Sequence, residues 1–200
     1  MTLTAEQGGL YLATTSPQII DVPDLTYLMI DGLGPPDGED FDLAMRALYQ
    51  VCFSVRGEIS AAGRRTGTPL EALWGPPCEP MRAGRRPSWR WTLMLPQATA
   101  PARLLAAGLA DAVTRVRDLV PPLPVDEVYV SVLREGRCVQ AMHVGAYADE
   151  AATVSRLLAH AEANGYAPSG RHHEIYLSDP DQTAPQWLRT IVRLPVAPQF

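Results

Sequence analysis

Short apolar runs alternate along the chain with stretches of helical periodicity, and this alternation predicts most of its elements. Apolar runs bounded by Gly, Pro or Asp are typical of strands, whereas apolar positions spaced by three and four indicate one buried helix face. The predicted strands are residues 25–30, 70–74, 89–96, 127–134, 138–143, 173–177 and 190–196, and the predicted helices begin near Phe41, Pro101 and Asp149. The pattern therefore predicts an α+β protein.

The predicted elements occur twice in the same order, as strand, helix, strand and strand. Residues 29–32 are echoed by 142–145, residues 70–74 by 173–177, and residues 92–96 by 190–195. We interpret the chain as one domain, residues 1–200, built as a tandem pseudo-twofold repeat. Repeat one covers about 22–97, a linking helix and strand 101–134, and repeat two about 137–196. This predicts an antiparallel sheet with helices on one face and a ligand cleft between the repeats. Chance matching of short apolar runs is the alternative interpretation.

Composition narrows the class of protein. The 200 residues are 46% hydrophobic and 20% charged, as in an ordinary globular domain. All 17 basic residues are Arg and the net charge is −5, which argues against nucleic acid as a partner. No apolar run approaches the about 20 residues that span a bilayer, and the first residues lack the features of a secretion signal. Three cysteines without metal-ligand spacing suit free thiols. We expect a cytoplasmic monomer or weak dimer without membrane contact.

Glu174 is the most informative single candidate for chemistry. It lies in a predicted strand whose alternation places Glu174 and Tyr176 on one face and Ile175 and Leu177 on the other. The apolar face is expected to pack on the helices, which directs the carboxylate and the phenol to the cleft side. Glu71 occupies the matching place in repeat one, so both carboxylates are expected to face the shared groove. A solvated strand face is the alternative for Glu174.

Aromatic residues form the second signal. Trp74, Trp89 and Trp91 lie close together in the sequence, although only 7% of the chain is aromatic. They form either a wall for a flat or cationic ligand or ordinary core filling. Tyr147 follows a predicted strand at the corner before a helix, where it either donates a hydrogen bond to a ligand carbonyl or covers the helix start.

Metal and cofactor sites are not predicted. His172 and His173 are adjacent and so point to opposite faces of a strand, and His143 and His160 lack neighbours at ligand spacing. The sequence contains no Gly-rich phosphate loop, nucleophile elbow or HExxH motif. We therefore expect neither a bound metal nor a cofactor.

The chain resembles a known family over nearly its whole length, from about Ile20 to Val196. The residues that carry the resemblance are 22–32, 70–74, 91–95, 145–147, 173–180 and 188–193, and Glu-Ile-Tyr-Leu-x-Asp-Pro at 174–180 is the most specific of them. They look like the GyrI-like small-molecule-binding proteins, which are built from two SHS2-like repeats around a ligand cleft. The resemblance implies a functional glutamate at Glu174. The chain departs from the family pattern at Gly75, often aromatic there, and at Ala146, often Pro.

The branch that this chain resembles includes cyclopropanoid cyclopropyl hydrolases. Such enzymes use an aromatic cage to open the cyclopropane of DNA-alkylating antibiotics of the yatakemycin and duocarmycin type, which protects the cell. The resemblance implies that Glu174 and Tyr147 are catalytic, and that Trp74, Trp89, Trp91, Tyr176 and Glu71 bind the substrate. Two other interpretations stay open: a protein that only binds a flat aromatic or cationic molecule, and a protein inhibitor of the gyrase-inhibitor kind.

Overall fold

Two strands at the centre of the sheet, β3 (Leu70–Trp74) and β8 (His172–Tyr176), join two similar halves of the molecule. The computed structural model describes residues 9–55, 69–75, 89–97, 102–119 and 122–199. The strand order is β1-β6-β9-β8-β3-β4-β2-β5, with every neighbouring pair antiparallel, and β7 also pairs with β9. The remaining strands are β1 (Gln18–Val22), β2 (Leu25–Leu33), β4 (Arg90–Pro96), β5 (Tyr129–Leu133), β6 (Gly136–Val144), β7 (Tyr166–Pro168) and β9 (Arg189–Pro198).

Each half contains a strand, a helix and two further strands. The first half is β2, α2 (Glu39–Val55), β3 and β4, and the second is β6, α4 (Ala151–Ala163), β8 and β9. The helix α3 (Ala102–Leu119) lies between them in the chain. The part of the chain that the structure describes also contains three short 3₁₀ turns: η1 (Val125–Glu127), η2 (Tyr147–Asp149) and η3 (Pro185–Trp187). The predicted α+β class, with an antiparallel sheet of tandem units, is confirmed.

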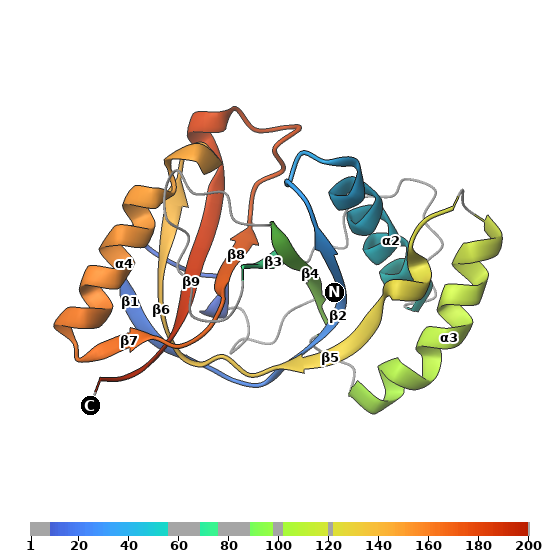
Figure 1. Cartoon of the computed structure of the whole chain (residues 1–200), viewed down its shortest axis with the longest axis horizontal. Coiled ribbons are helices and arrows are strands. Elements are labelled where there is room, and N and C mark those ends of the chain that lie inside the picture. The colour runs from blue at the N-terminus through green and yellow to red at the C-terminus, as the bar shows by residue number, and fades with distance from the viewer. Residues whose placement is uncertain (1–8, 56–68, 76–88, 98–101, 120–121, 200) are drawn as a thin grey trace.

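The two halves exchange their outer strands. β1 pairs with β6 of the second half, and β5 pairs with β2 of the first half. Both connections cross the bottom of Figure 1, in blue from β1 to β2 and in yellow from β5 to β6. The hairpin that Glu135-Gly136 predicts is therefore wrong, because β5 and β6 pair with strands in opposite halves. Gly136 has a φ of 64°, in the left-handed region that glycine tolerates best, and it starts β6.

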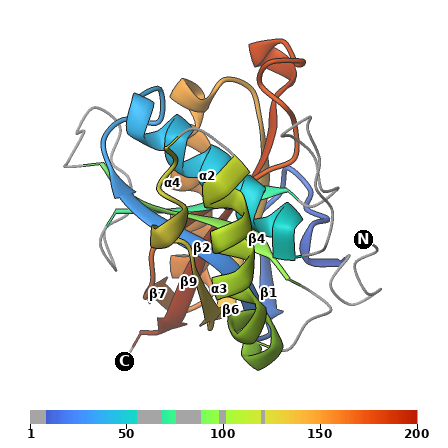
Figure 2. The same cartoon turned by 90° about the vertical axis from the view of Figure 1, so that its right-hand side faces the viewer.

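The three helices of the described residues, α2, α3 and α4, cover one face of the sheet, and its middle lies between them. The helix α2 packs chiefly on β2 and β4, α3 packs beside α2, and α4 packs chiefly on β6, β7 and β9. Figure 1 shows α4 at one side of the sheet and α2 with α3 at the other, and Figure 2 shows α2 and α3 side by side in front of the strands. The central strands β3 and β8 therefore lie in the part of the sheet between the half under α4 and the half under α2.

Cross-strand pairing defines one row of side chains on the helix face. The row runs through six strands as Ile30, Leu93, Ala72, Glu174, Val192 and Ala141. Its first three members belong to the core under α2, and its last two to the core under α4. Residues that face each other across a strand pair share a face. Glu174 is therefore the charged member of an otherwise apolar row, at the junction of the two cores.

The other face is covered by the start of the described chain. Leu10 and Tyr11 pack there against Tyr27, Met29, Leu73 and Met94. Ile175 and Met142 extend this core, with Tyr11 and Ala13 against them. The apolar alternation of β8 is thus buried by the N-terminal segment, which hydrophobic periodicity alone does not identify as a covering layer.

Several element boundaries differ from the prediction. The glycines and prolines from Gly32 to Gly38 predict a loop, but β2 extends to Leu33, so the loop begins later. The helical spacing predicts that Leu104 lies on the buried face of α3, but Leu104 is exposed. The strands β1 and β7 were not predicted. The predicted helix end at Gly63, the irregular segment before Trp89 and the start of α3 at Pro101 lie wholly or largely outside the described residues. No helix in the described ranges has the length and apolarity that crossing a membrane requires.

Candidate active site

Glu174 lies on the helix face of the sheet, and the expectation that its face turns away from the helices is wrong. It pairs with Ala72 on one side and Val192 on the other, and only 5% of the residue is exposed. The cause is the N-terminal segment, which covers the apolar Ile175 on the opposite face. Glu174 is nevertheless not a solvated surface residue. Its carboxylate is buried in the middle of the face, between the core under α2 and the core under α4.

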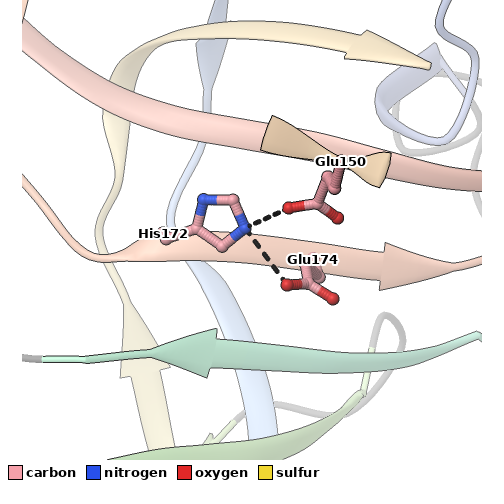
Figure 3. Close-up of side chains that lie close together, drawn as sticks. All are labelled: Glu150, His172 and Glu174. Atoms are coloured by element: carbon pink, nitrogen blue, oxygen red, sulfur yellow. Dashed lines mark hydrogen bonds and ion pairs between the residues drawn. The ribbon is translucent and has the colours of Figure 1, made fainter. Parts of the chain in front are cut away.

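The side chain of His172 contacts two carboxylates, those of Glu174 and Glu150. The His172 Nε2 atom lies 3.1 Å from Glu174 Oε1 and 2.9 Å from Glu150 Oε1. Figure 3 shows the ring between the two carboxylates, with both contacts made by the same nitrogen. His172 is fully buried and Glu150 is 4% exposed. Burial lowers the pKa of His172, but the two adjacent carboxylates of Glu150 and Glu174 outweigh it and raise the pKa to about 10.

Local structure explains why Glu150 points inward. It is the N-cap residue of α4 and makes no side-chain capping hydrogen bond. Glu150, Val154, Leu157 and Ala161 are spaced by four, three and four, and all are buried, so Glu150 is the first member of the buried helix face. In β8, alternation puts His172 and Glu174 on the same face. Helix and strand periodicity together bring the three side chains into one cluster.

Two tyrosines connect this cluster to the surface. Tyr147, at the start of η2, packs edge-on against Tyr176 with ring centroids 5.8 Å apart. Tyr147 is 41% exposed, and burial together with the nearby Glu174 charge raises its pKa to about 12. The buried His143 lies 3.0 Å from the carbonyl oxygen of Ala146, which fixes the corner just before Tyr147. A phenol that stays protonated beside a buried carboxylate suits hydrogen-bond donation to a ligand oxygen.

The tryptophans extend from the site into the core under α2. Trp74 donates from Nε1 to the Tyr176 hydroxyl at 3.2 Å and stacks on Phe41, with centroids 5.9 Å apart. Trp89 is half-buried and packs edge-on against Trp74. Trp91 is 1% exposed and packs edge-on against Phe41. The structure thus brings Trp74 next to Tyr176, with Trp89 on Trp74, whereas Trp91 fills the core.

Glu71 is not a counterpart of Glu174, and the expectation that both face one groove is wrong. Glu71 pairs with Ile175, while Glu174 pairs with Ala72, so the two carboxylates lie on opposite faces. A one-residue offset between the matched strands reverses the face of every side chain. Glu71 is fully buried and accepts hydrogen bonds from Tyr11 at 2.7 Å and Tyr27 at 3.0 Å. It belongs to a separate buried cluster.

That second cluster contains two basic and two acidic side chains, which make three contacts. His173 lies 2.9 Å from Glu71 and 2.9 Å from Glu135, and Arg193 lies 3.3 Å from Glu135. Arg193 also donates to the carbonyl of Leu10 at 2.7 Å, which attaches the N-terminal segment to this face. These satisfied hydrogen bonds identify a structural network.

Glu150, His172 and Glu174 form the group within the described ranges whose ligand atoms, all within 4.8 Å of one another, have the composition of a cation site. Sequence reasoning missed Glu150 and His172. The sequence pattern indicates only that a helix begins near Asp149, and the adjacency of His172 and His173 argues against a metal site. The available signals were the helical spacing of Glu150 with Val154 and the alternation of His172 with Glu174.

Comparison with known proteins identifies the family of this chain. Residues 111–197 match the GyrI-like small molecule binding domain. A crystal structure of an uncharacterized conserved protein from Listeria innocua is 32% identical, with 96% of this chain and 97% of that chain covered and a TM-score of 0.81. Two crystal structures of a hydrolase from Listeria innocua are 31% and 30% identical over the same shares, with TM-scores of 0.78 and 0.76. A comparison with curated proteins gives no match.

The fold and the site define a small-molecule-binding protein with two sheet–helix units and a buried acidic cluster between them. The chain belongs to the GyrI-like small-molecule-binding family, since the relatives more than 30% identical match it over nearly their whole length.

Proposed function

We propose that this protein is a hydrolase that opens the spirocyclopropane ring of cyclopropanoid antibiotics of the yatakemycin and duocarmycin type. The observation that carries the proposal is the Glu174 carboxylate, buried and held by His172, in the same cluster as the half-exposed Tyr147 phenol. The two similar structures called hydrolases, at 30% and 31% identity, support an enzymatic role over binding alone.

The proposed reaction needs a base for water and a donor for the ligand carbonyl. Glu174 takes a proton from a water molecule, and the water oxygen bonds to the cyclopropane methylene carbon. The bond between that methylene and the spiro carbon breaks, and its electron pair enters the dienone ring, which becomes aromatic. The former carbonyl oxygen becomes a phenolate that Tyr147 stabilises by a hydrogen bond. The proton on Glu174 then returns to the phenolate, so the sum of the steps is addition of one water.

The aromatic residues give this chemistry a place for a flat substrate. The rings of Tyr147 and Tyr176 pack edge-on near Glu174. Trp74 donates a hydrogen bond to the Tyr176 hydroxyl. A conjugated ring system can contact these π faces by stacking or edge-on packing. The substrate carbonyl then points toward the Tyr147 hydroxyl, and the cyclopropane toward the carboxylate.

A direct test is incubation of the protein with a duocarmycin-type spirocyclopropane in ¹⁸O-labelled water. We expect a product heavier by one labelled water, with the label on the former cyclopropane methylene, formed faster than without protein. The variant Glu162→Gln, which changes an exposed glutamate of α4, serves as a matched control and should behave as wild type. Tight binding with unchanged ligand mass would refute hydrolysis and favour sequestration.

A further inference from the structure

Glu150 is the group in the site to which the proposed mechanism gives no role. Its Oε1 lies 2.9 Å from His172 Nε2, yet among the described residues it has no hydrogen-bond partner of suitable geometry. The single hydrogen on Nε2 satisfies the geometry toward Glu174 instead. One N–H group cannot serve two carboxylates at once. A buried carboxylate oxygen is therefore left unpaired if both glutamates are ionised.

The net charge of the cluster also indicates that one of its two carboxyl groups is protonated. With His172 protonated and both glutamates ionised, the buried cluster carries one net negative charge. With one carboxyl protonated, the cluster is neutral. Two carboxylates that share a site rarely ionise together, because each disfavours the charged form of the other. A carboxylate oxygen of Glu150 and one of Glu174 lie within 4.8 Å of each other, so this repulsion acts at short range.

We propose that Glu150 keeps a proton at neutral pH and thereby leaves the His172 N–H and the ionised form to Glu174. This inference rests on the proposed function for its catalytic meaning. Glu150 is then a positioning residue, which acts through Glu174 and not on the substrate.

The groups around Glu150 support this assignment. Burial, followed by the Glu174 charge, raises the pKa of Glu150, while His172 and His143 oppose the rise. Two phenols also face the acidic cluster: Tyr147, just before Glu150 in the chain, and Tyr176 of β8. The N-terminus of α4 favours an ionised Glu150, as any helix N-terminus does for an acid. The pKa of Glu150 is therefore raised even though the α4 N-terminus and two histidines favour its ionised form.

Loss of this proton should slow the reaction. As the pH rises, an ionised Glu150 competes with Glu174 for the His172 N–H and adds a second negative charge beside the phenolate that forms near Tyr147. The rate should therefore fall on the alkaline side. In Glu150→Gln the side chain keeps its shape and stays neutral at every pH, so the part of the alkaline fall that Glu150 causes should disappear. The part that follows loss of the His172 proton should remain, and turnover should stay within about tenfold of wild type.

The test combines infrared spectroscopy, which needs no substrate, with a pH–rate profile. We expect wild type and Glu162→Gln to show the carbonyl band of a buried carboxylic acid at neutral pH, and we expect it to disappear at high pH. The band should be lost in Glu150→Gln, which lacks that acid. It should also be lost in Glu174→Gln, where Glu150 ionises against His172. Because the wild-type titration is informative alone, the inference stays testable if a variant fails to fold.

Distinct outcomes separate the inference from the proposed function. The role of Glu150 would be overturned if the band were absent in wild type, if it persisted in Glu150→Gln, or if the alkaline fall were unchanged in that variant. It would also be overturned if Glu150→Gln lost turnover as completely as Glu174→Gln does. A divalent cation bound stoichiometrically to wild type and absent from Glu150→Gln would overturn it too, because the cation would then take the place of the proton. If the bands behave as expected but wild type opens no cyclopropanoid, the protonation stands and the proposed function fails.

Discussion

His172 and His173 are consecutive in β8, yet each lies between two glutamates on opposite faces of the sheet. Strand alternation alone produces this separation. His172 lies in the cluster with Glu150 and Glu174, next to the exposed Tyr147. His173 lies in the buried network with Arg193 on the opposite face. A single strand thus supports the candidate site on one face and anchors the N-terminal segment on the other.

Glu174→Gln should reduce ring opening by about 10²- to 10⁴-fold, the usual contribution of a general base. Binding should stay within about tenfold, because the amide keeps the shape of the side chain. Product formation by mass spectrometry and affinity by calorimetry measure the two effects. Glu162→Gln is the matched control, and turnover retained in Glu174→Gln would contradict a base role for this residue.

Tyr147→Phe should slow turnover by about 10²- to 10³-fold, as removal of one donor to a developing oxyanion does. The free energy of unfolding should change by no more than about 0.5 kcal/mol, since the ring is 41% exposed and its edge contact with Tyr176 is kept. Steady-state kinetics and urea denaturation measure these quantities. Tyr166→Phe, in β7 at the C-terminal edge of the second half, is a control that should leave turnover unchanged.

The sequence predicts the strands and helices of the two units because their periodicities are local. It identifies Glu174, Tyr147, Tyr176 and Trp74 as neighbours through the family resemblance. It fails for Glu71, whose face depends on a one-residue register between β3 and β8 that short echoes do not define. It also fails for the face of Glu174, which depends on burial of Ile175 by the distant N-terminal segment.

Gly32→Ala tests the packing that places Trp91 in the core. A Cβ at Gly32 would lie 2.0 Å from the Trp91 ring, which is 1% exposed and donates from Nε1 to the Gly34 carbonyl at 3.1 Å. The ring must shift, and overpacking of this kind costs about 1–3 kcal/mol of unfolding free energy. Gly108→Ala in α3 has open space around the added Cβ and should stabilise the protein by up to about 1 kcal/mol. Equal urea midpoints for the two variants would contradict this packing.

The His173 network should make stability depend on pH. Burial lowers the pKa of His173, but Glu135 and Glu71 outweigh it and raise the pKa from 6.5 to about 9. A histidine whose pKa is higher in the folded protein stabilises fully below its unfolded pKa. That stabilisation is lost as the pH rises to the folded value.

His173→Gln should therefore be less stable than wild type near pH 6, and the difference between them should shrink toward pH 9. The slope that this one group contributes is at most about 1.4 kcal/mol per pH unit. His172 and Glu150 also have raised pKa values, so part of the pH dependence remains in the variant. Urea denaturation of both proteins at several pH values measures the difference, with His160→Gln on the outer part of α4 as the control. A difference that stays constant between pH 6 and 9 would show that His173 is neutral in the folded protein, and that hydrogen bonding rather than charge holds the network.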